Sequence, residues 1–405
     1  MTNEVPAEVL AAAMTAPDPS PAPAAPAKKP RARAKKATTA KKQQGPNPAA
    51  GLIAAMKFLA PAQSKTGNVN QTFCHIAHHW AAASNGVLTI ATKIEEDLNA
   101  CPQWALFSDA LGKVVEDVTI TQLSPGMLSV ASGDFRGVVP CAPPEQVPIT
   151  PPDQPCARID NRIRDAFEAV LKIPNEQSPR AAYAGVLLQA NSVVATNGAI
   201  IFEYWHGIDL PPNLIIPKAA AQAVAKSSKN LDALGFSSSS VTFYFEDGSF
   251  IKTQTYAEQY PEYAHVLNCD YSTFWPIPER FFEAVSTVAA FSENANVFFK
   301  NGQIVSSMND ETPSFYRIEG LPEGEGFNGK YIAMIEGKAA RIGFGQSSNI
   351  GALFFVGNNI RGCIAALDRS APKVYTSESS DDWANPGYAQ EERGRYFDPD
   401  DEIPF

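Results

Sequence analysis

Apolar residues recur along this chain with two different spacings, and the two kinds of segment alternate. Apolar positions three or four residues apart predict amphipathic helices, whereas alternating or continuous β-branched and aromatic residues predict strands. The segments with helical spacing are 49–60, 103–115, 159–172, 216–230, 277–291 and 328–341. Strand-like runs lie between and after them, as in 86–92, 192–205 and 240–256. The pattern therefore predicts an α+β protein with interleaved helices and strands.

The order of these segments repeats three times, with a period of about 110 residues. Two sets of equivalent positions mark the repeat, one at the end of a short helix-like segment and one in the last strand pair of each unit. They are Ser64, Ser178 and Ser292 in the first set, and Phe135, Phe250 and Ile360 in the second. The spacing is 114 residues in the first set, and 115 and then 110 residues in the second.

The repeat divides the predicted folded body into three units, 49–150, 155–268 and 274–370. Each unit has the order helix, strands, helix, strands, and the proline-dense segment 140–155 separates the first two. With 405 residues, each unit is long enough to bury a core of its own. A copied unit is typical of a modular ring or array rather than of a single catalytic cleft.

Charge is distributed unevenly along the chain, whose formal net charge is −10. Residues 1–48 hold eight Lys/Arg and three acids, and the basic cluster 28–42 contains no acid. We expect this Ala/Pro-rich arm to be disordered, and it fits either a phosphate-binding arm or a solvated linker. Residues 371–405 hold nine acids against three basic residues and predict an acidic, disordered tail. DNA binding by the remaining acidic body would require its basic residues to gather in one place.

Two predicted helices carry basic residues with the same i, i+8, i+11 spacing, which at about 100° per residue puts all three on one face. These residues are Lys218, Lys226 and Lys229 in one helix, and Lys330, Lys338 and Arg341 in the other. A single face of this kind is typically just solvated, but its repetition favours a surface that contacts DNA phosphates. The other segments add Lys57, Lys113, Arg162, Arg164, Lys172 and Arg280 as candidates for the same DNA-binding surface.

Five segments carry a further signal through their order and spacing. They are SGDFRGVVPCAPPEQVP (132–148), GVLLQANSVVATNGAIIFE (185–203), LIIPKAAAQAV (214–224), EQYPEYAHVLN (258–268) and GFNGKYIAMI (326–335). Together they resemble the bacterial DNA polymerase III beta subunit, the DNA sliding clamp, in a divergent form such as phages encode. The resemblance extends over all three units.

The resemblance implies three repeated clamp domains, with helices lining a central bore and antiparallel sheets outside. Two subunits would join head to tail as a homodimer and encircle double-stranded DNA. Such a ring tethers a replicative DNA polymerase, is opened by a clamp loader, needs no cofactor and is not an enzyme. It would work in the bacterial cytoplasm, or in the host cytoplasm if a phage encodes it. The alternatives are a non-ring adaptor that bridges DNA and replication or recombination proteins through its tails, and a mimic that blocks partners of the host clamp.

The resemblance also implies a partner cleft between the second and third units. Carried over by position, it comprises Tyr183, Thr196, Gly198, Ala199, Ile200, Ile201, Pro261, His265, Val266, Cys363, Ala365, Ala366 and Leu367. The sequence departs from the family pattern at three places along this cleft. The family's His-Arg after the glycine is Ala199-Ile200, its Arg-Arg is Ala264-His265, and its terminal M-P-M-R-L is replaced by Ala365-Ala366-Leu367-Asp368. We therefore expect an apolar cleft with an altered polar rim.

The last residues, DPDDEIPF, resemble the C-terminal tip of bacterial single-stranded-DNA-binding proteins. The tip residues are Asp400, Asp401, Glu402, Ile403, Pro404 and Phe405. A terminal Phe with its free carboxylate suits an apolar pocket with a basic lip, and the acids would steer it there. One hypothesis is that the tip recruits proteins that read the single-strand binder; another is that it folds back into the chain's own cleft.

Other chemistry is not expected. FCHIAHHW places Cys74, His75, His78 and His79 close together, but neighbouring side chains of a strand alternate faces, and no second ligand cluster follows. We therefore predict no metal site. The six cysteines are scattered without a CxxC and indicate reduced thiols. No apolar run approaches the roughly 18 residues of a membrane span, and nucleotide-binding and nucleophile-elbow motifs are absent from the sequence.

Overall fold

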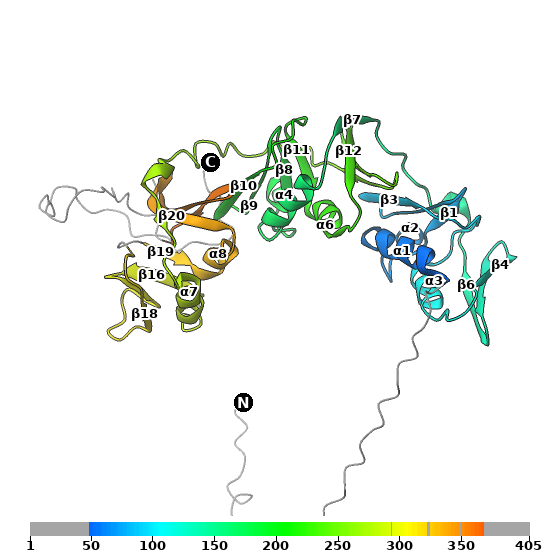
Figure 1. Ribbon diagram of the computed structural model, residues 1–405, viewed down its shortest axis with the longest axis horizontal. Helices are drawn as coiled ribbons and strands as arrows, with labels where there is room; N and C mark the ends of the chain where they lie inside the picture. The colour runs from blue at the N-terminus through cyan, green and yellow to red at the C-terminus, as the bar shows by residue number, and fades with distance from the viewer. Residues whose placement is uncertain (1–47, 293, 322–324, 348–349, 368–405) are drawn as a thin grey trace, which may run out of the picture. The chain divides into compact units, whose positions relative to one another are not determined.

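The computed structural model describes residues 48–292, 294–321, 325–347 and 350–367 (Figure 1). Residues 1–47 of the predicted arm, the acidic tail and its tip lie outside these ranges. The described residues form short helices and antiparallel strands, as predicted for an α+β protein. Within the described ranges, every helix is too short or too polar to span a bilayer.

The first third of the described chain has helices before and between two groups of strands. The elements are α1 (Ala50–Leu59), α2 (Val69–Thr72), β1 (His75–Ala77), β2 (Trp80–Ser84), β3 (Leu88–Lys93), α3 (Trp104–Leu111), β4 (Thr119–Ser124), β5 (Met127–Ser132) and β6 (Phe135–Pro140). α1 buries Leu52, Met56 and Leu59 along one face, which packs against β2, β3 and α3. That face follows from the spacing of its apolar residues.

The second third repeats this order. Its elements are β7 (Pro155–Arg158), α4 (Arg162–Val170), α5 (Ala181–Ala184), β8 (Gly185–Leu188), β9 (Ser192–Thr196), β10 (Ile200–Trp205), β11 (Leu214–Pro217), α6 (Lys218–Lys226), β12 (Leu231–Phe236), β13 (Ser240–Phe245) and β14 (Phe250–Gln254). α4 and α6 pack on each other, and α4 also covers β9 and β10. Pro217 immediately precedes α6, where its missing N–H leaves no helical hydrogen bond unmade.

The last third has the same order again. Its elements are β15 (Trp275–Pro276), α7 (Phe281–Ala289), β16 (Asn296–Lys300), β17 (Gln303–Val305), β18 (Phe315–Arg317), β19 (Gly326–Asn328), α8 (Gly329–Met334), β20 (Ala339–Ser347), β21 (Ile350–Gly357) and β22 (Ile360–Ala365). Phe135, Phe250 and Ile360 are the first residues of β6, β14 and β22, the closing strand of each repeat. These three positions are equivalent in the fold, as their spacing predicts.

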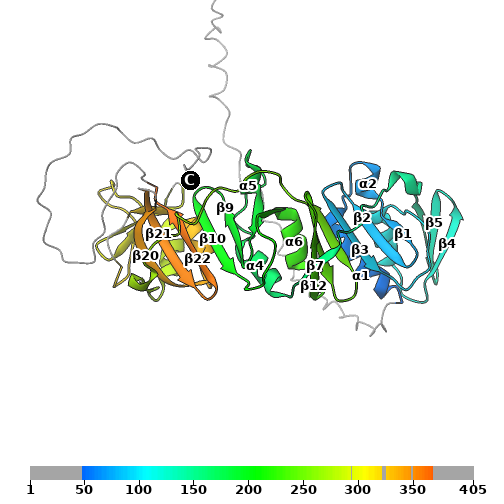
Figure 2. The same ribbon diagram turned by 90° about the horizontal axis from the view of Figure 1, so that it is seen from above.

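The described strands form four sheets, and two of these join strands from different repeats. One sheet has the order β1-β2-β3-β14-β13-β12-β7, and another the order β11-β8-β9-β10-β22-β21-β20-β15. β3 pairs with β14 through Ile90 opposite Ile251, and β10 pairs with β22 through Ile201 opposite Cys363. Figure 2 shows β10 and β22 side by side at the second junction. Backbone hydrogen bonds therefore connect each repeat to the next.

Two predicted helices are shorter than the sequence indicates. α6 ends at Lys226, where Ser227 takes an extended conformation, so Lys229 lies in the connection to β12. Serine favours the ends of helices because its hydroxyl competes with the helix for backbone hydrogen bonds. The predicted shared face of Lys218, Lys226 and Lys229 on one helix is therefore wrong.

The same correction applies to α8, which ends at Met334. Gly337 follows with φ +71°, a left-handed conformation that glycine adopts without strain, and the chain enters β20 at Ala339. Lys338 consequently lies in the turn and Arg341 in a strand. The predicted helix face of Lys330, Lys338 and Arg341 does not exist.

Lys229 instead stabilises the first junction, where β3 pairs with β14. Its ammonium donates to the hydroxyls of Thr92 and Ser249, both at 2.8 Å, and pairs with Asp247. It also lies 4.5 Å from the centre of the Phe58 ring. Because Thr92 and Phe58 belong to the first repeat and the other partners to the second, this lysine links the two.

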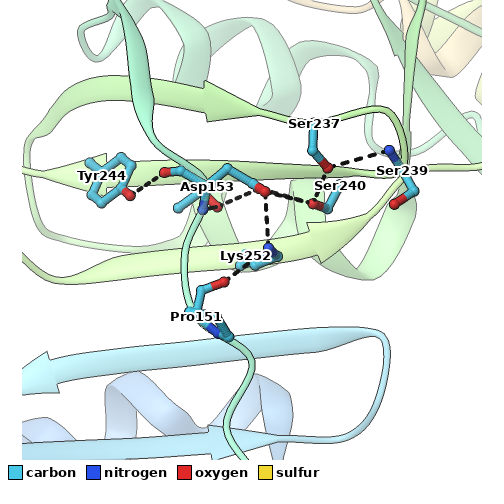
Figure 3. A network of polar contacts seen from close by, with 8 residues as sticks. Pro151, Asp153, Ser237, Ser239, Ser240, Tyr244 and Lys252 are labelled. Atoms are coloured by element: carbon cyan, nitrogen blue, oxygen red, sulfur yellow. Dashed lines mark hydrogen bonds and ion pairs between the residues drawn. The ribbon is translucent and has the colours of Figure 1, made fainter.

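The proline-rich linker is anchored at the same junction through Asp153 (Figure 3). Its carboxylate pairs with Lys252 at 3.0 Å, and both side chains are largely buried, 8% and 13% exposed. Further hydrogen bonds come to the carboxylate from Ser240 and Thr242, to the Asp153 carbonyl from Tyr244, and from Lys252 to the Pro151 carbonyl. The network fixes the linker across β13 and β14.

The second junction holds a buried ion pair. Glu203 on β10 is 5% exposed and accepts hydrogen bonds from Arg361 on β22, with the carboxylate oxygen 2.7 Å from Nη2 and 2.8 Å from Nε. Ser192 donates to the same carboxylate at 3.0 Å. Beside the pair, Phe202 and Phe355 meet edge to face at 4.7 Å over Gly362. A Cβ at Gly362 would collide with the Phe355 ring and the Ile201 carbonyl, so glycine is needed there.

Candidate functional site: an apolar cavity at the second junction

An apolar cavity opens at the junction of β10 and β22. It encloses about 370 Å³, counting the part open to solvent. The residues that line it are Gly198, Ala199, Ile200, Ile201, Val266, Ser347, Ile350, Gly351, Ala352, Cys363 and Ala365. Burial raises the pKa of the Cys363 thiol well above its usual range, so at neutral pH the sulfur is uncharged and acts as apolar lining.

The turn between β9 and β10 forms one lip of the cavity. Gly198 takes φ +88°, and the Asn197 carboxamide oxygen accepts from the amides of Ala199 and Ile200, both at 3.1 Å. The Thr196 hydroxyl donates to the Ile200 carbonyl at 2.9 Å and accepts from the Gly198 amide at 3.1 Å. Side-chain hydrogen bonds of this kind stabilise a tight turn. The lip is therefore preorganised.

The opposite wall comes from β21 and the end of β22. The amide of Ala366 donates to the Gly351 carbonyl at 2.7 Å, and the amide of Leu367 to the Gly326 carbonyl at 2.8 Å. A Cβ on Gly351 would overlap the carboxylate of buried Glu325, so a larger residue there would require the Glu325 side chain to move. The last described residues of the chain are thus held against the cavity.

The structure brings together seven of the residues expected in the cleft, namely Gly198, Ala199, Ile200, Ile201, Val266, Cys363 and Ala365. Tyr183 is buried in the same apolar cluster as Val266, and Thr196 is buried at the start of the turn that forms the lip. Ala366 and Leu367 follow Ala365 along the cavity wall. Pro261, five residues before Val266, is half-buried, and His265 is exposed. Sequence reasoning missed Ser347, Ile350, Gly351 and Ala352, which belong to β20 and β21 and carry no family motif.

A second, more polar hollow lies beside the cavity. It is lined by Ala264, His265, Leu267, Asn268, Cys269, Tyr271 and Arg361. Val266, between His265 and Leu267, lines the apolar cavity, so the two hollows share this segment. Arg361 is 30% exposed and stacks 4.9 Å from the Trp205 ring. An apolar group and an anionic group of one ligand could therefore bind side by side.

Comparison with known proteins places this architecture. The sequence matches no protein-family model and no curated protein. The structure matches the Pseudomonas aeruginosa DNA polymerase sliding clamp with a TM-score of 0.67 and 14% identity, over 78% of this chain and 97% of that one. The Bacillus subtilis clamp gives a TM-score of 0.66 and 14% identity, over 78% and 96% of the two chains. The fold is that of the bacterial DNA sliding clamp.

A further clamp, that of Helicobacter pylori, matches with a TM-score of 0.65 and 14% identity, over 78% of this chain and 97% of that one. That clamp was solved with a bound DNA ligase peptide. The predicted resemblance to clamps is thus confirmed at the level of the fold.

Several basic residues predicted to contact DNA are used inside the clamp fold. Lys338 donates to the Ala169 carbonyl at 2.6 Å and lies over the Phe202 ring, and burial lowers its pKa. The other basic residues with partners are Arg162 with Asp160, Arg164 with the Lys229 carbonyl, Lys218 with the Pro174 carbonyl, Arg280 with Glu283, and Arg341 with the Phe274 carbonyl. Together with Lys229, these residues contribute to structure.

The remaining candidates are exposed lysines. Lys57, Lys113, Lys172, Lys226 and Lys330 are exposed, and none forms an ion pair with another described residue. They come from or follow α1, α3, α4, α6 and α8. Their contact with DNA stays a prediction.

The FCHIAHHW segment forms β1 and the turn into β2. His78 and His79 take positive φ in that turn, His75 Nδ1 lies 3.3 Å from the Val147 carbonyl, and buried Cys74 contacts the Pro102 carbonyl. These side chains point to different partners. Across the described ranges, no group of three or more Cys, His, Asp or Glu side chains could hold a metal ion.

Proposed function

We propose that this protein is a DNA sliding clamp, a homodimeric ring that encircles double-stranded DNA and tethers a replicative polymerase. The observation that carries the proposal is a fold shared with known clamps over 96–97% of their length. The three units 49–150, 155–268 and 274–370 would be its domains. A ring is retained by topology rather than adhesion, so a net charge of −10 is compatible with this role. A loader would open it in the cytoplasm of a bacterium or of a phage-infected host.

Two sheet edges support closure of such a ring. β4 lies at the edge of the β4-β5-β6 sheet, and β18 at the edge of the β18-β17-β16-β19 sheet. Leu123 on β4 is 46% exposed, and Phe315 on β18 is 52% exposed. Exposed edge strands with apolar side chains pair readily with another chain. Pairing β4 of one copy with β18 of the other, twice, would close a dimer.

Retention on circular DNA tests the ring. Protein incubated with a nicked circular duplex should co-elute with it in gel filtration and be released when a restriction enzyme cuts the circle. Leu123→Asp places a charge at the proposed closure and should weaken the dimer at least about tenfold. The same variant should lose retention and shift toward monomer mass in light scattering.

Val87→Asp is the matched control, because Val87 is equally exposed, at 47%, but lies between β2 and β3. It should retain both the dimer and the DNA. Binding that survives linearisation would instead favour the non-ring adaptor. A natural protein that is strictly monomeric at micromolar concentration would contradict the proposal.

The exposed lysines give a second prediction. Lys226→Glu combined with Lys330→Glu should weaken binding to duplex DNA, and each lost phosphate contact should reduce the slope of log K against log salt by about 0.9. Lys65→Glu with Lys300→Glu changes the same charge at two other exposed lysines. Salt titrations of both double variants on a fluorescent duplex provide the measurement. Equal losses would mean that DNA does not contact this particular set of residues.

A further inference from the structure

We propose that the chain's C-terminal tip, Ile403-Pro404-Phe405, occupies the apolar cavity of its own subunit and competes there with partner peptides. Because the cavity is the proposed partner cleft, the competition rests on the proposed function, whereas occupancy by the tip does not depend on ring closure. The proposal follows from where the described chain ends, from the chemistry of the cavity and from the sequence of the tail.

The described chain ends on the wall of the cavity. Cys363 and Ala365 line the cavity, and the next two amides, of Ala366 and Leu367, are hydrogen-bonded to Gly351 and Gly326. The tail that follows, residues 368–405, is therefore attached at the cavity's edge. No other segment of comparable length begins there.

The tip and the two hollows match in polarity. The final residues 398–405 read DPDDEIPF, with four acids followed by an apolar end. The cavity offers the apolar side chains of Ile200, Val266 and Ile350 to such an end. The adjoining hollow is lined by Arg361 and His265, whose N–H groups are hydrogen-bond donors for the preceding acids, while the Arg361 charge is shared with Glu203. An apolar anchor with an acidic flank thus fits this pair of hollows.

Tethering makes even weak binding sufficient. A linker of roughly 40 residues that behaves as a random coil would have a root-mean-square span of about 35 Å and would give an effective concentration of about 1 mM. If the free tip binds with a Kd of about 0.1 mM, the tethered tip would fill the cavity about nine-tenths of the time. A competing peptide would then bind about tenfold more weakly to the full chain than to a chain without its tip.

The experiment uses the fluorescein-labelled peptide DPDDEIPF as its probe, with anisotropy measured against the full chain and against a chain ending at residue 397. The probe should bind the shortened chain about tenfold more tightly. Phe405→Ala in the full chain should restore probe binding, because it removes the anchor and leaves the charges. Trp383→Ala is the control, since it removes a different aromatic side chain from the same tail and should leave the full chain blocked.

Ala365→Glu in the shortened chain locates the probe, since an added carboxylate in the cavity wall should abolish binding; a thermal unfolding curve shows whether that variant folds. If that variant does not fold, hydrogen exchange locates the probe instead: the probe should slow exchange of residues 198–201 in the shortened chain. If the weaker probe binding of the full chain persists when the protein is diluted tenfold, the tip occupies the cavity of its own subunit. If it is lost on dilution, the tip of a second copy fills the cavity, which overturns the proposal. Equal binding of the probe to full and shortened chains, or to neither, also overturns it. Either result leaves the test on circular DNA unaffected.

Discussion

Glu203→Ala is expected to open the junction between β10 and β22 about a hundredfold more often than in the natural protein. The substitution removes a buried carboxylate and leaves the guanidinium of Arg361, only 30% exposed, without its counter-charge. Breaking a buried pair in this way costs about 3 kcal/mol, and that free energy corresponds to roughly a hundredfold change in an opening equilibrium. Hydrogen exchange of peptides covering 200–205 and 360–365 measures it directly.

A double variant separates the charge from the packing. Glu203→Leu with Arg361→Met replaces the whole pair by apolar groups, which is often close to neutral, so it should exchange nearly as slowly as the natural protein. Glu283→Ala breaks a solvent-exposed pair with Arg280 and should leave the junction unchanged. Exchange at the junction that is the same in Glu203→Ala and the natural protein would contradict this account. Ile201 and Cys363 pair across the junction and both line the cavity. Glu203→Ala should therefore also weaken binding of the DPDDEIPF peptide in the cavity.

Asp153→Ala is expected to release the proline-rich linker and to lower the free energy of unfolding by about 3 kcal/mol. The substitution leaves the largely buried Lys252 without its partner and also removes acceptors for Ser240 and Thr242. In thermal unfolding, the midpoint should fall by about 5 °C or more. Limited proteolysis should cut within 140–155 faster than in the natural protein. An unchanged cleavage rate in this segment would show that the network does not hold the linker.

The effect of Asp153 should depend on pH. Burial alone would raise the pKa of Asp153, but hydrogen bonds from Lys252, Thr242 and Ser240 lower it overall below its ordinary value of 3.8. A carboxyl group with a lowered folded-state pKa contributes stability above its unfolded-state pKa and loses it as pH falls through the folded-state pKa. The destabilisation by Asp153→Asn should therefore be largest above about pH 5 and shrink below about pH 4.

Exposed Asp109 provides the control for this pH series, and Asp109→Asn should change the midpoint little at any pH. Some acid sensitivity should remain in Asp153→Asn. Burial would also raise the pKa of Asp247, but hydrogen bonds from Lys229 and Ser249 lower it overall, so Asp247 contributes stability over the same pH range. A destabilisation by Asp153→Asn that is constant from pH 3 to pH 8 would contradict the assigned role of the charge.

Local spacing was sufficient for the elements and for their repetition. Apolar positions at helical intervals correctly predicted α1, α4 and α7, and the positions of Phe135, Phe250 and Ile360 correctly predicted three equivalent strands. The ends of helices were less predictable. α6 ends before its predicted end at a serine pair, and α8 ends before its predicted end at a glycine turn. The spacing of the lysines predicted longer helices than these local signals allow. Most of the cavity lining was also predictable, since seven of its eleven residues, Gly198 to Ile201, Val266, Cys363 and Ala365, were expected from the resemblance to clamps.

The sequence by itself determined the repeated α+β plan, the charge of the arm, body and tail, and, through its resemblance to clamps, most of the cavity lining. The α+β plan follows from contacts between residues close in the chain, which leave a periodic record in the sequence. The charges follow from composition, and the cavity lining follows from short segments that resemble clamps. Only the tertiary structure decided which strands join the repeats, that Lys229 and Lys338 fasten junctions, and that β20 and β21 complete the cavity. Those pairings join residues more than a hundred positions apart, and a long-range contact leaves no periodic pattern at either of its ends.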